Sequence, residues 1–143
     1  MADPAPDDVL HSRLGYLLKH AYHRLAEDIT TALRPLGIDS RELAVLVLLD
    51  DTDIPLSQLD LAQRLRIDRT TMTQFTDTLE AKGLLARRRS AEDRRKNIIE
   101  LTVDGQARLA AAEKVRAEAE TRFLAPLGAS AAGLIEALRT LTR

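Results

Sequence analysis

Residues 57–83 read SQLDLAQRLRIDRTTMTQFTDTLEAKG, and this stretch decides the fold. Ser57 is a favourable N-cap residue, because its hydroxyl can accept a hydrogen bond from a free backbone N–H of the first turn. Asp60 places a negative charge in that turn, where the helix dipole favours one. We expect the short helix that Ser57 opens to end near Leu65.

A second N-cap follows at Asp68, three residues beyond the end of that helix. We expect the next helix to span residues 69–82 and to end at Gly83, since glycine adopts the left-handed conformation of a helix C-terminus without strain. Two short helices joined by a tight turn predict a helix-turn-helix.

Two short runs with the composition of strands come next, at residues 84–89 and 97–102, on either side of the charged stretch SAEDRRK. The second run contains Ile98 and Ile99, and β-branched side chains are favoured in strands. The sequence therefore predicts a β-hairpin, and its tip carries Asp93, Arg94 and Arg95.

Longer helices are expected on both sides of this core. Apolar residues recur at steps of three or four from Leu10 onward, which predicts a long amphipathic helix that Pro35 and Gly37 end. Asp39 and Glu42 have the spacing of a capping box and predict a second helix.

The C-terminal part of the chain predicts two more helices. Thr102 opens a long helix to about Leu124, and Pro126 and Gly128 break it. Ser130 is then expected to cap a last helix.

The predicted fold is mainly α with a small β-wing, a winged helix-turn-helix of about six helices. We expect one domain over residues 1–143. Within it, residues 39–102 are expected to form a DNA-binding lobe, and residues 8–35 and 103–143 a dimerisation region.

Charge is distributed unevenly along the chain. The formal net charge is −1, yet residues 64–96 carry ten Lys or Arg and only five Asp or Glu. A local positive field, more than the global charge, attracts phosphate groups. The basic middle of an acidic chain therefore favours a nucleic-acid partner.

Several functions are disfavoured by composition. The chain has no Cys, which excludes disulfides, thiolate metal sites and thiol redox switches. The longest apolar run, residues 43–49, is far too short to cross a bilayer, and the N-terminus lacks the order of a signal peptide. With no catalytic motif either, we expect a cytoplasmic, non-enzymatic protein without a cofactor or a membrane partner.

The second helix of the helix-turn-helix has two distinct faces. Met72, Phe75 and Leu79 form an apolar face that we expect to pack inward. The opposite face carries Thr, Gln and Arg, and in a major groove Gln can pair with adenine and Thr can contact a thymine methyl. The alternative is a solvated face, although such faces are more often rich in Glu and Lys. The predicted DNA-binding residues of this helix are Arg69, Thr70, Thr71, Thr73 and Gln74.

The hairpin adds a dense group of cations beside that helix. Cations this close together repel one another, and binding to a polyanion such as DNA offsets that repulsion. A narrow minor groove also attracts an inserted Arg. The alternative is a charged run that only keeps the protein soluble. In such a run we would expect more acidic residues between the basic ones. The predicted DNA-binding residues of the wing are Arg88, Asp93, Arg94, Arg95 and Lys96.

These motifs closely resemble the MarR family (multiple antibiotic resistance regulators) over nearly the whole chain. The resemblance rests on residues 61–65, 68–84, 92–95, 99–102 and 104–105. It implies a DNA-binding transcriptional regulator, in which Asp93 braces the wing tip and Arg95 enters the minor groove of double-stranded DNA. Gln74 stands where the family often has Arg, which puts a guanine contact there in doubt, and Thr76 stands where an aliphatic residue is common. A winged-helix protein-interaction module that has lost DNA binding is the alternative function.

The resemblance also implies a homodimer formed by the terminal helices, reading a pseudo-palindromic operator. Apolar residues on the first and last helices, such as Leu14 and Leu138, offer surface for such a dimer. The family further implies a small aromatic or carboxylate effector. Residues that could line its pocket are Arg13, Tyr16, His20, His23 and Arg41.

Two other interpretations of those pocket residues stay open. The side chains can be ordinary interface or surface residues, which we favour. His20 and His23, with Glu27 one turn on, also have a spacing that permits a metal, although a His pair on a helix is usually structural.

Overall fold

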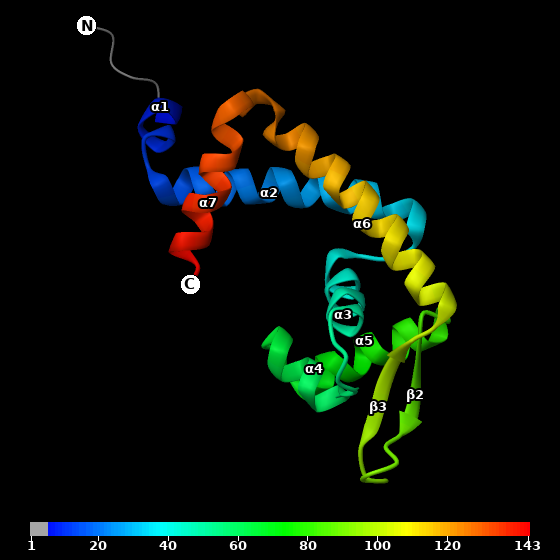
Figure 1. The fold of residues 1–143 in the computed structure, drawn as a ribbon. Helices are drawn as coiled ribbons and strands as arrows, with labels where there is room; N and C mark the ends of the chain where they lie inside the picture. The colour runs from blue at the N-terminus through cyan, green and yellow to red at the C-terminus, as the bar shows by residue number, and fades with distance from the viewer. Residues whose placement is uncertain (1–5) are drawn as a thin grey trace, which may run out of the picture. The chain divides into compact units, whose positions relative to one another are not determined.

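The computed structural model describes residues 6–143 and consists of helices with one three-stranded sheet (Figure 1). In chain order the elements are α1 (Pro6–His11), α2 (Leu14–Leu33), the 3₁₀ helix η1 (Arg34–Leu36), α3 (Ser40–Asp50), β1 (Leu56–Ser57), α4 (Gln58–Leu65), α5 (Arg69–Ala81), β2 (Leu85–Arg89), β3 (Asn97–Leu101), α6 (Val103–Leu124), the 3₁₀ helix η2 (Ala125–Ser130) and α7 (Ala131–Leu141).

The chain divides into two compact units. One contains the chain before Leu33 and after Lys114, and the other contains residues 33–114. The second unit holds the helix-turn-helix and the whole sheet, so the elements expected to contact DNA lie within it.

The sequence predicts α3 correctly, including the way it begins. The Asp39 side chain accepts hydrogen bonds from the backbone N–H groups of Arg41 and Glu42, and the Glu42 carboxylate accepts one from the Asp39 N–H. This reciprocal capping box satisfies N–H groups that a helix start otherwise leaves free.

The helix-turn-helix is formed by α4 and α5. Ser57 caps α4 and Asp68 caps α5, as the sequence predicts, and Gly83 adopts a left-handed conformation (φ +73°) just after α5. The turn between the helices is made by Arg66, the one non-glycine residue with positive φ (+54°) in the described part of the chain. Its backbone N–H donates to the carbonyl oxygens of Ala62 and Gln63, which ends α4.

The sheet has the strand order β1-β3-β2, with both pairs antiparallel. Ile98 and Ile99 of β3 are buried, and the Ser90 N–H donates to the Lys96 carbonyl where the hairpin closes. The core of this unit combines them with fully buried side chains of α3, α4 and α5, among them Leu46, Leu61 and Leu79.

A very close backbone approach joins the start of α6 to the turn after α5. The Thr102 hydroxyl donates to the Gly83 carbonyl, and its backbone N–H donates to the Leu84 carbonyl. A Cβ at Gly105 would lie only 1.9 Å from the Leu84 oxygen. Only glycine leaves room for this contact.

Two helix predictions need correction. The expected single helix from residue 8 is broken before Leu14, where the Ser12 hydroxyl donates to the Val9 carbonyl. Ser130 does not cap α7: its backbone is helical and its side chain makes no cap hydrogen bond, because η2 leads directly into α7.

No helix among residues 6–143 combines the length and the apolar character needed to span a membrane.

Candidate nucleic-acid interface

Helix α5 presents a polar face to solvent. Arg69, Thr70 and Gln74 are exposed, whereas Met72 and Leu79 are fully buried. The expectation that Phe75 packs inward is only partly correct, since Phe75 is half-buried and the Arg41 guanidinium lies 5.4 Å from its ring centroid. Its neighbour Thr76, which was not expected in the core, is fully buried.

Thr76 shows how a hydroxyl can be buried inside this helix. Its Oγ1 donates to the Met72 carbonyl one turn back at 2.8 Å, so no polar group is left without a partner. Thr76 is therefore a core residue.

Two of the five residues expected to read DNA bases use their hydroxyl protons inside the chain. Thr71 Oγ1 donates to Asp68 at 2.7 Å, and Thr73 Oγ1 donates to the Arg69 carbonyl at 2.9 Å. Both are half-buried. The groups that remain available for contact with a base are their methyl groups and the lone pairs of their hydroxyl oxygens.

Gln58 is a residue of this surface that sequence reasoning missed. It is the first residue of α4, and its Nε2 donates to Thr73 Oγ1 at 2.6 Å. The bond spans fifteen positions in sequence and links the two helices of the motif. The sequence of α4 alone does not indicate this hydrogen bond, because the partner lies on the next helix.

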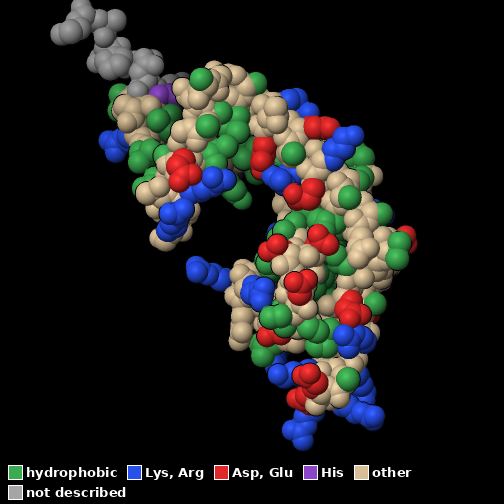
Figure 2. All heavy atoms as spheres, in the orientation of Figure 1, with side chains coloured by type: hydrophobic (Ala, Val, Ile, Leu, Met, Phe, Trp, Pro, Cys, Tyr) green, Lys and Arg blue, Asp and Glu red, His purple; other side chains and the backbone are tan. Residues whose placement is uncertain are grey.

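The wing tip is formed around Asp93. Its Oδ1 accepts a hydrogen bond from the Arg95 backbone N–H at 3.0 Å, and its carbonyl accepts one from the Lys96 N–H. Arg94, Arg95 and Lys96 are exposed, and Figure 2 shows Lys and Arg side chains gathered around the end of the β2–β3 hairpin.

Other cations near the wing are held by carboxylates. Arg87 Nη2 lies 2.5 Å from Asp77 and its Nη1 lies 3.4 Å from Glu80, so the strand β2 is braced against α5. Arg88 Nε donates to Glu100 on the neighbouring strand at 2.6 Å. Arg88 is therefore less available for DNA than the cations of the tip.

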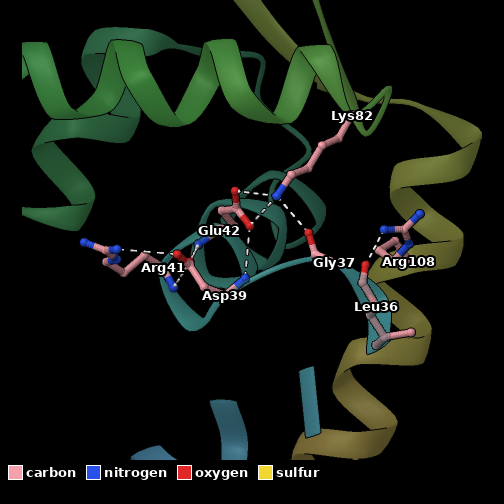
Figure 3. A network of polar contacts seen from close by, with 7 residues as sticks. All are labelled: Leu36, Gly37, Asp39, Arg41, Glu42, Lys82 and Arg108. Carbon is pink, nitrogen blue, oxygen red and sulfur yellow. Dashed lines mark hydrogen bonds and ion pairs between the residues drawn. The ribbon is translucent and has the colours of Figure 1, made fainter. Parts of the chain in front are cut away.

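Lys82 is held inside the unit as well (Figure 3). Its Nζ donates to both carboxylate oxygens of the buried Glu42, at 2.9 and 3.0 Å, and to the Gly37 carbonyl at 2.7 Å. An ammonium has three donors, and all three are used. This network ties the C-terminal end of α5 to the start of α3.

Arg108 of α6 makes a comparable contact nearby. Its Nη1 donates to the Leu36 carbonyl, next to the carbonyl that Lys82 binds (Figure 3). The short segment before α3 is therefore fixed from two sides, by the end of α5 and by α6.

A hollow of about 300 Å³ lies between α4, the start of α5 and the base of the wing tip. Its lining includes the cationic side chains of Arg69, Arg95 and Lys96, with Gln58 and Asp60. Elements from both halves of the expected DNA surface thus face one common space.

Two carboxyl groups at the helix starts have lowered pKa values. Hydrogen bonds from Ser57 hold the pKa of Asp60 below its ordinary value, and the charges of Lys96 and Arg64 act in the same direction. Hydrogen bonds from Thr71 lower the pKa of Asp68. Both groups are therefore ionised at neutral pH, as helix caps require.

The residues expected to line an effector pocket fall into different units. Tyr16 packs against His20 with tilted rings whose centroids lie 4.0 Å apart, and the ring centroids of Tyr22 and His23 lie 5.7 Å apart. Those residues and Arg13 belong to the first unit, and Arg41 belongs to the second. Within residues 6–143, no three His, Asp or Glu side chains gather closely enough to hold a metal ion.

Comparisons with known proteins identify relatives among transcriptional regulators of the MarR family. The model of the MarR family matches residues 38–96. The HTH-type transcriptional repressor Rv2887 of Mycobacterium tuberculosis is 33% identical over 129 residues, which are 90% of this chain and 87% of that protein. The uncharacterised HTH-type transcriptional regulator YdgJ of Bacillus subtilis is 34% identical over 93 residues, and the chain spans only 56% of its length.

Solved structures extend the match to the whole chain. The transcriptional repressor CouR bound to a 23-mer DNA duplex has 35% sequence identity and a TM-score of 0.88, over 99% of this chain and 100% of that one. CouR bound to p-coumaroyl-CoA has 34% identity and a TM-score of 0.80, over 94% of each chain. The chain described here belongs to the MarR family.

Proposed function

We propose that this protein is a sequence-specific DNA-binding transcriptional regulator, a ligand-responsive repressor that binds a pseudo-palindromic operator as a homodimer in the cytoplasm. The observation that carries the proposal is the pairing, within one compact unit, of an exposed Thr- and Gln-bearing face on α5 with an exposed cationic wing tip. A regulator of this kind needs no catalytic group.

On this proposal, the two elements read different grooves. Helix α5 lies in the major groove, where Thr70 and Gln74 contact base edges, Thr71 and Thr73 present their methyl groups, and Arg69 adds a positive charge at the start of the helix. The wing carries Arg95 into the adjacent minor groove, while Arg88, Arg94 and Lys96 add positive charge. Asp93 keeps the tip in shape through the Arg95 N–H.

We further propose that a small aromatic or carboxylate effector controls DNA binding. Its support is the similarity to CouR, a repressor with a solved complex with p-coumaroyl-CoA. Arg13, Tyr16, His20, His23 and Arg41 are the candidate contacts. Replacing Tyr16 by Ala is expected to weaken the response to an effector and to leave DNA binding in its absence unchanged.

The test is selection of bound duplexes from a random DNA pool, repeated with candidate aromatic acids and acyl-CoA thioesters. A two-fold dimer is expected to enrich two related half-sites about 10 base pairs apart, centre to centre. Recovery of no preferred sequence, together with retained folding, would favour the alternative of a protein-interaction module.

A further inference from the structure

We propose that the hollow between α4, α5 and the wing holds one backbone phosphate of the bound duplex, with Arg69 and Lys96 as its charged ligands. This inference rests on the proposed function, because it requires DNA on this face. It assigns a site to the space between the start of α5 and the wing tip.

Duplex geometry supplies the first reason. A sugar-phosphate strand always separates a major groove from the neighbouring minor groove. A protein that places α5 in one groove and its wing in the next must therefore straddle that strand. The space between the two elements, where the hollow of about 300 Å³ lies, is where the strand has to pass.

The charges around the hollow supply the second reason. Arg69, Arg95 and Lys96 come from two elements distant in sequence and line the same space. None of the three takes part in an ion pair in the described part of the chain, in contrast to Lys82, Arg87 and Arg88. Cations that line one space without a direct ion pair favour an anion between them.

Asp60 is the one acid that faces the hollow, and its carboxylate is already engaged. Its Oδ2 accepts hydrogen bonds from the Ser57 backbone N–H and from the Ser57 hydroxyl, both at 2.8 Å. Without Arg95, the two assigned cations against this one carboxylate leave a formal charge of +1, which matches the single negative charge of a phosphodiester.

Polar uncharged groups complete the site. Gln58 lines the hollow, and its amide is held in place by the hydrogen bond to Thr73. The volume is roughly ten times the ~30 Å³ that one water occupies in the liquid, so a phosphate fits with bridging waters. We assign Lys96 and Arg69 to the phosphate and leave Arg95 to the groove.

The test is a cycle that combines protein and DNA changes. The duplex obtained by selection is made in a series, each member carrying one uncharged methylphosphonate in place of one phosphate. Wild-type protein is expected to lose about tenfold in affinity when the phosphate of the hollow is neutralised. Lys96→Gln is expected to lose clearly less than wild type at that same position, because one of the two charged ligands of the phosphate is already gone.

Salt dependence provides a second readout. Lys96→Gln is expected to lower the slope of log affinity against log salt by about 0.9 for each subunit bound. Lys96→Arg keeps the charge and is expected to retain the wild-type slope. Lys114→Gln removes the same charge from an exposed position of α6 outside the hollow, and is expected to keep the wild-type methylphosphonate profile.

The outcomes separate the two proposals. If wild-type protein binds the duplex but Lys96→Gln and Arg69→Gln lose as much as wild type at every methylphosphonate, the hollow holds no phosphate and this inference is wrong. If wild-type protein enriches no duplex at all, the proposed function is wrong and the phosphate site falls with it.

Discussion

Gln74 and Arg95 are both exposed, and they differ in the chemistry they can offer a duplex. An amide can donate and accept at once, so it distinguishes one base edge from another. A guanidinium attracts phosphate and the negative potential of a narrow minor groove whatever the sequence. Two substitutions at these positions therefore have different expected signatures.

Gln74→Ala is expected to change sequence preference. If Gln74 makes a bidentate contact with adenine, its loss costs about 1–3 kcal/mol on the preferred duplex and little on duplexes altered at that base pair. The measurement is the affinity for a set of single-base variants of the selected duplex. A uniform loss across the set would contradict a base-reading role.

Arg95→Ala is expected to weaken binding to all duplexes by a similar factor. If the guanidinium also neutralises a phosphate, the salt slope falls by about one for each subunit bound. Arg24→Ala, which removes a charge from the exposed surface of α2, is the control and is expected to leave the slope unchanged. A shift of base preference in Arg95→Ala, with an unchanged slope, would count against this assignment.

At the scale of single elements, the helix starts of the motif depend on ionised carboxylates. Asp60 accepts the Ser57 N–H, and its pKa is lowered by the Ser57 hydrogen bonds. A lowered pKa in the folded chain means that the stabilisation is complete above the ordinary carboxyl pKa of 3.8 and is lost as the pH falls through the lower folded value.

Asp60→Asn is therefore expected to destabilise the lobe by about 1 kcal/mol at neutral pH, the usual contribution of a cap. The difference from wild type is expected to shrink as the pH falls below 3.8, because the unfolded chain then binds a proton that the folded chain does not, and to disappear once the folded carboxylate is protonated as well. The free energy of unfolding by urea, measured from about pH 6 to pH 2, tests this. Asp28→Asn on α2 is the control, and a difference that stays constant with pH would contradict the capping role.

Local sequence patterns predicted most of the elements of the DNA-binding lobe, since caps and apolar periodicity act over a few residues. Asp39, Ser57 and Asp68 each begin a helix as expected. Arg66 was not predicted as the left-handed residue of the turn, because arginine adopts that conformation only where the packing of both helices imposes it.

The site was predicted less completely, because its ion pairs and hydrogen bonds join residues far apart in sequence. In the sequence, Lys82 and Arg87 belong to the basic middle of the chain. In the structure, both form ion pairs with carboxylates. Likewise, the bond from Gln58 to Thr73 exists only once α4 and α5 have packed. The residue types were visible in the sequence, and their partners were not.

At the scale of the whole molecule, the proposed homodimer depends on apolar surface of the terminal helices. Leu14 and Leu141 are 67% and 72% exposed in the single chain, and Leu134, Ile135 and Leu138 of α7 are also exposed. The proposed dimer would remove this exposed apolar surface from water.

Light scattering at micromolar concentration is expected to give twice the mass of one chain. Ile135→Glu is expected to shift the mass toward one chain, because an acidic group would be buried without a partner in the interface. Val103→Glu introduces the same group at an exposed apolar position of the other unit and serves as the control. A monomeric mass for the wild-type protein would refute the dimer.

The contact at Gly105 limits which sequences this architecture can accept. The clash with the Leu84 oxygen would come from the Cβ itself, so no choice of rotamer relieves it. In a saturation library screened for folded protein, we expect position 105 to return glycine almost alone. Gly15 and Gly133, where an added Cβ meets nothing within 4 Å, are expected to tolerate alanine. A library in which alanine survives equally at all three positions would show that α6 can move away from the turn at little cost.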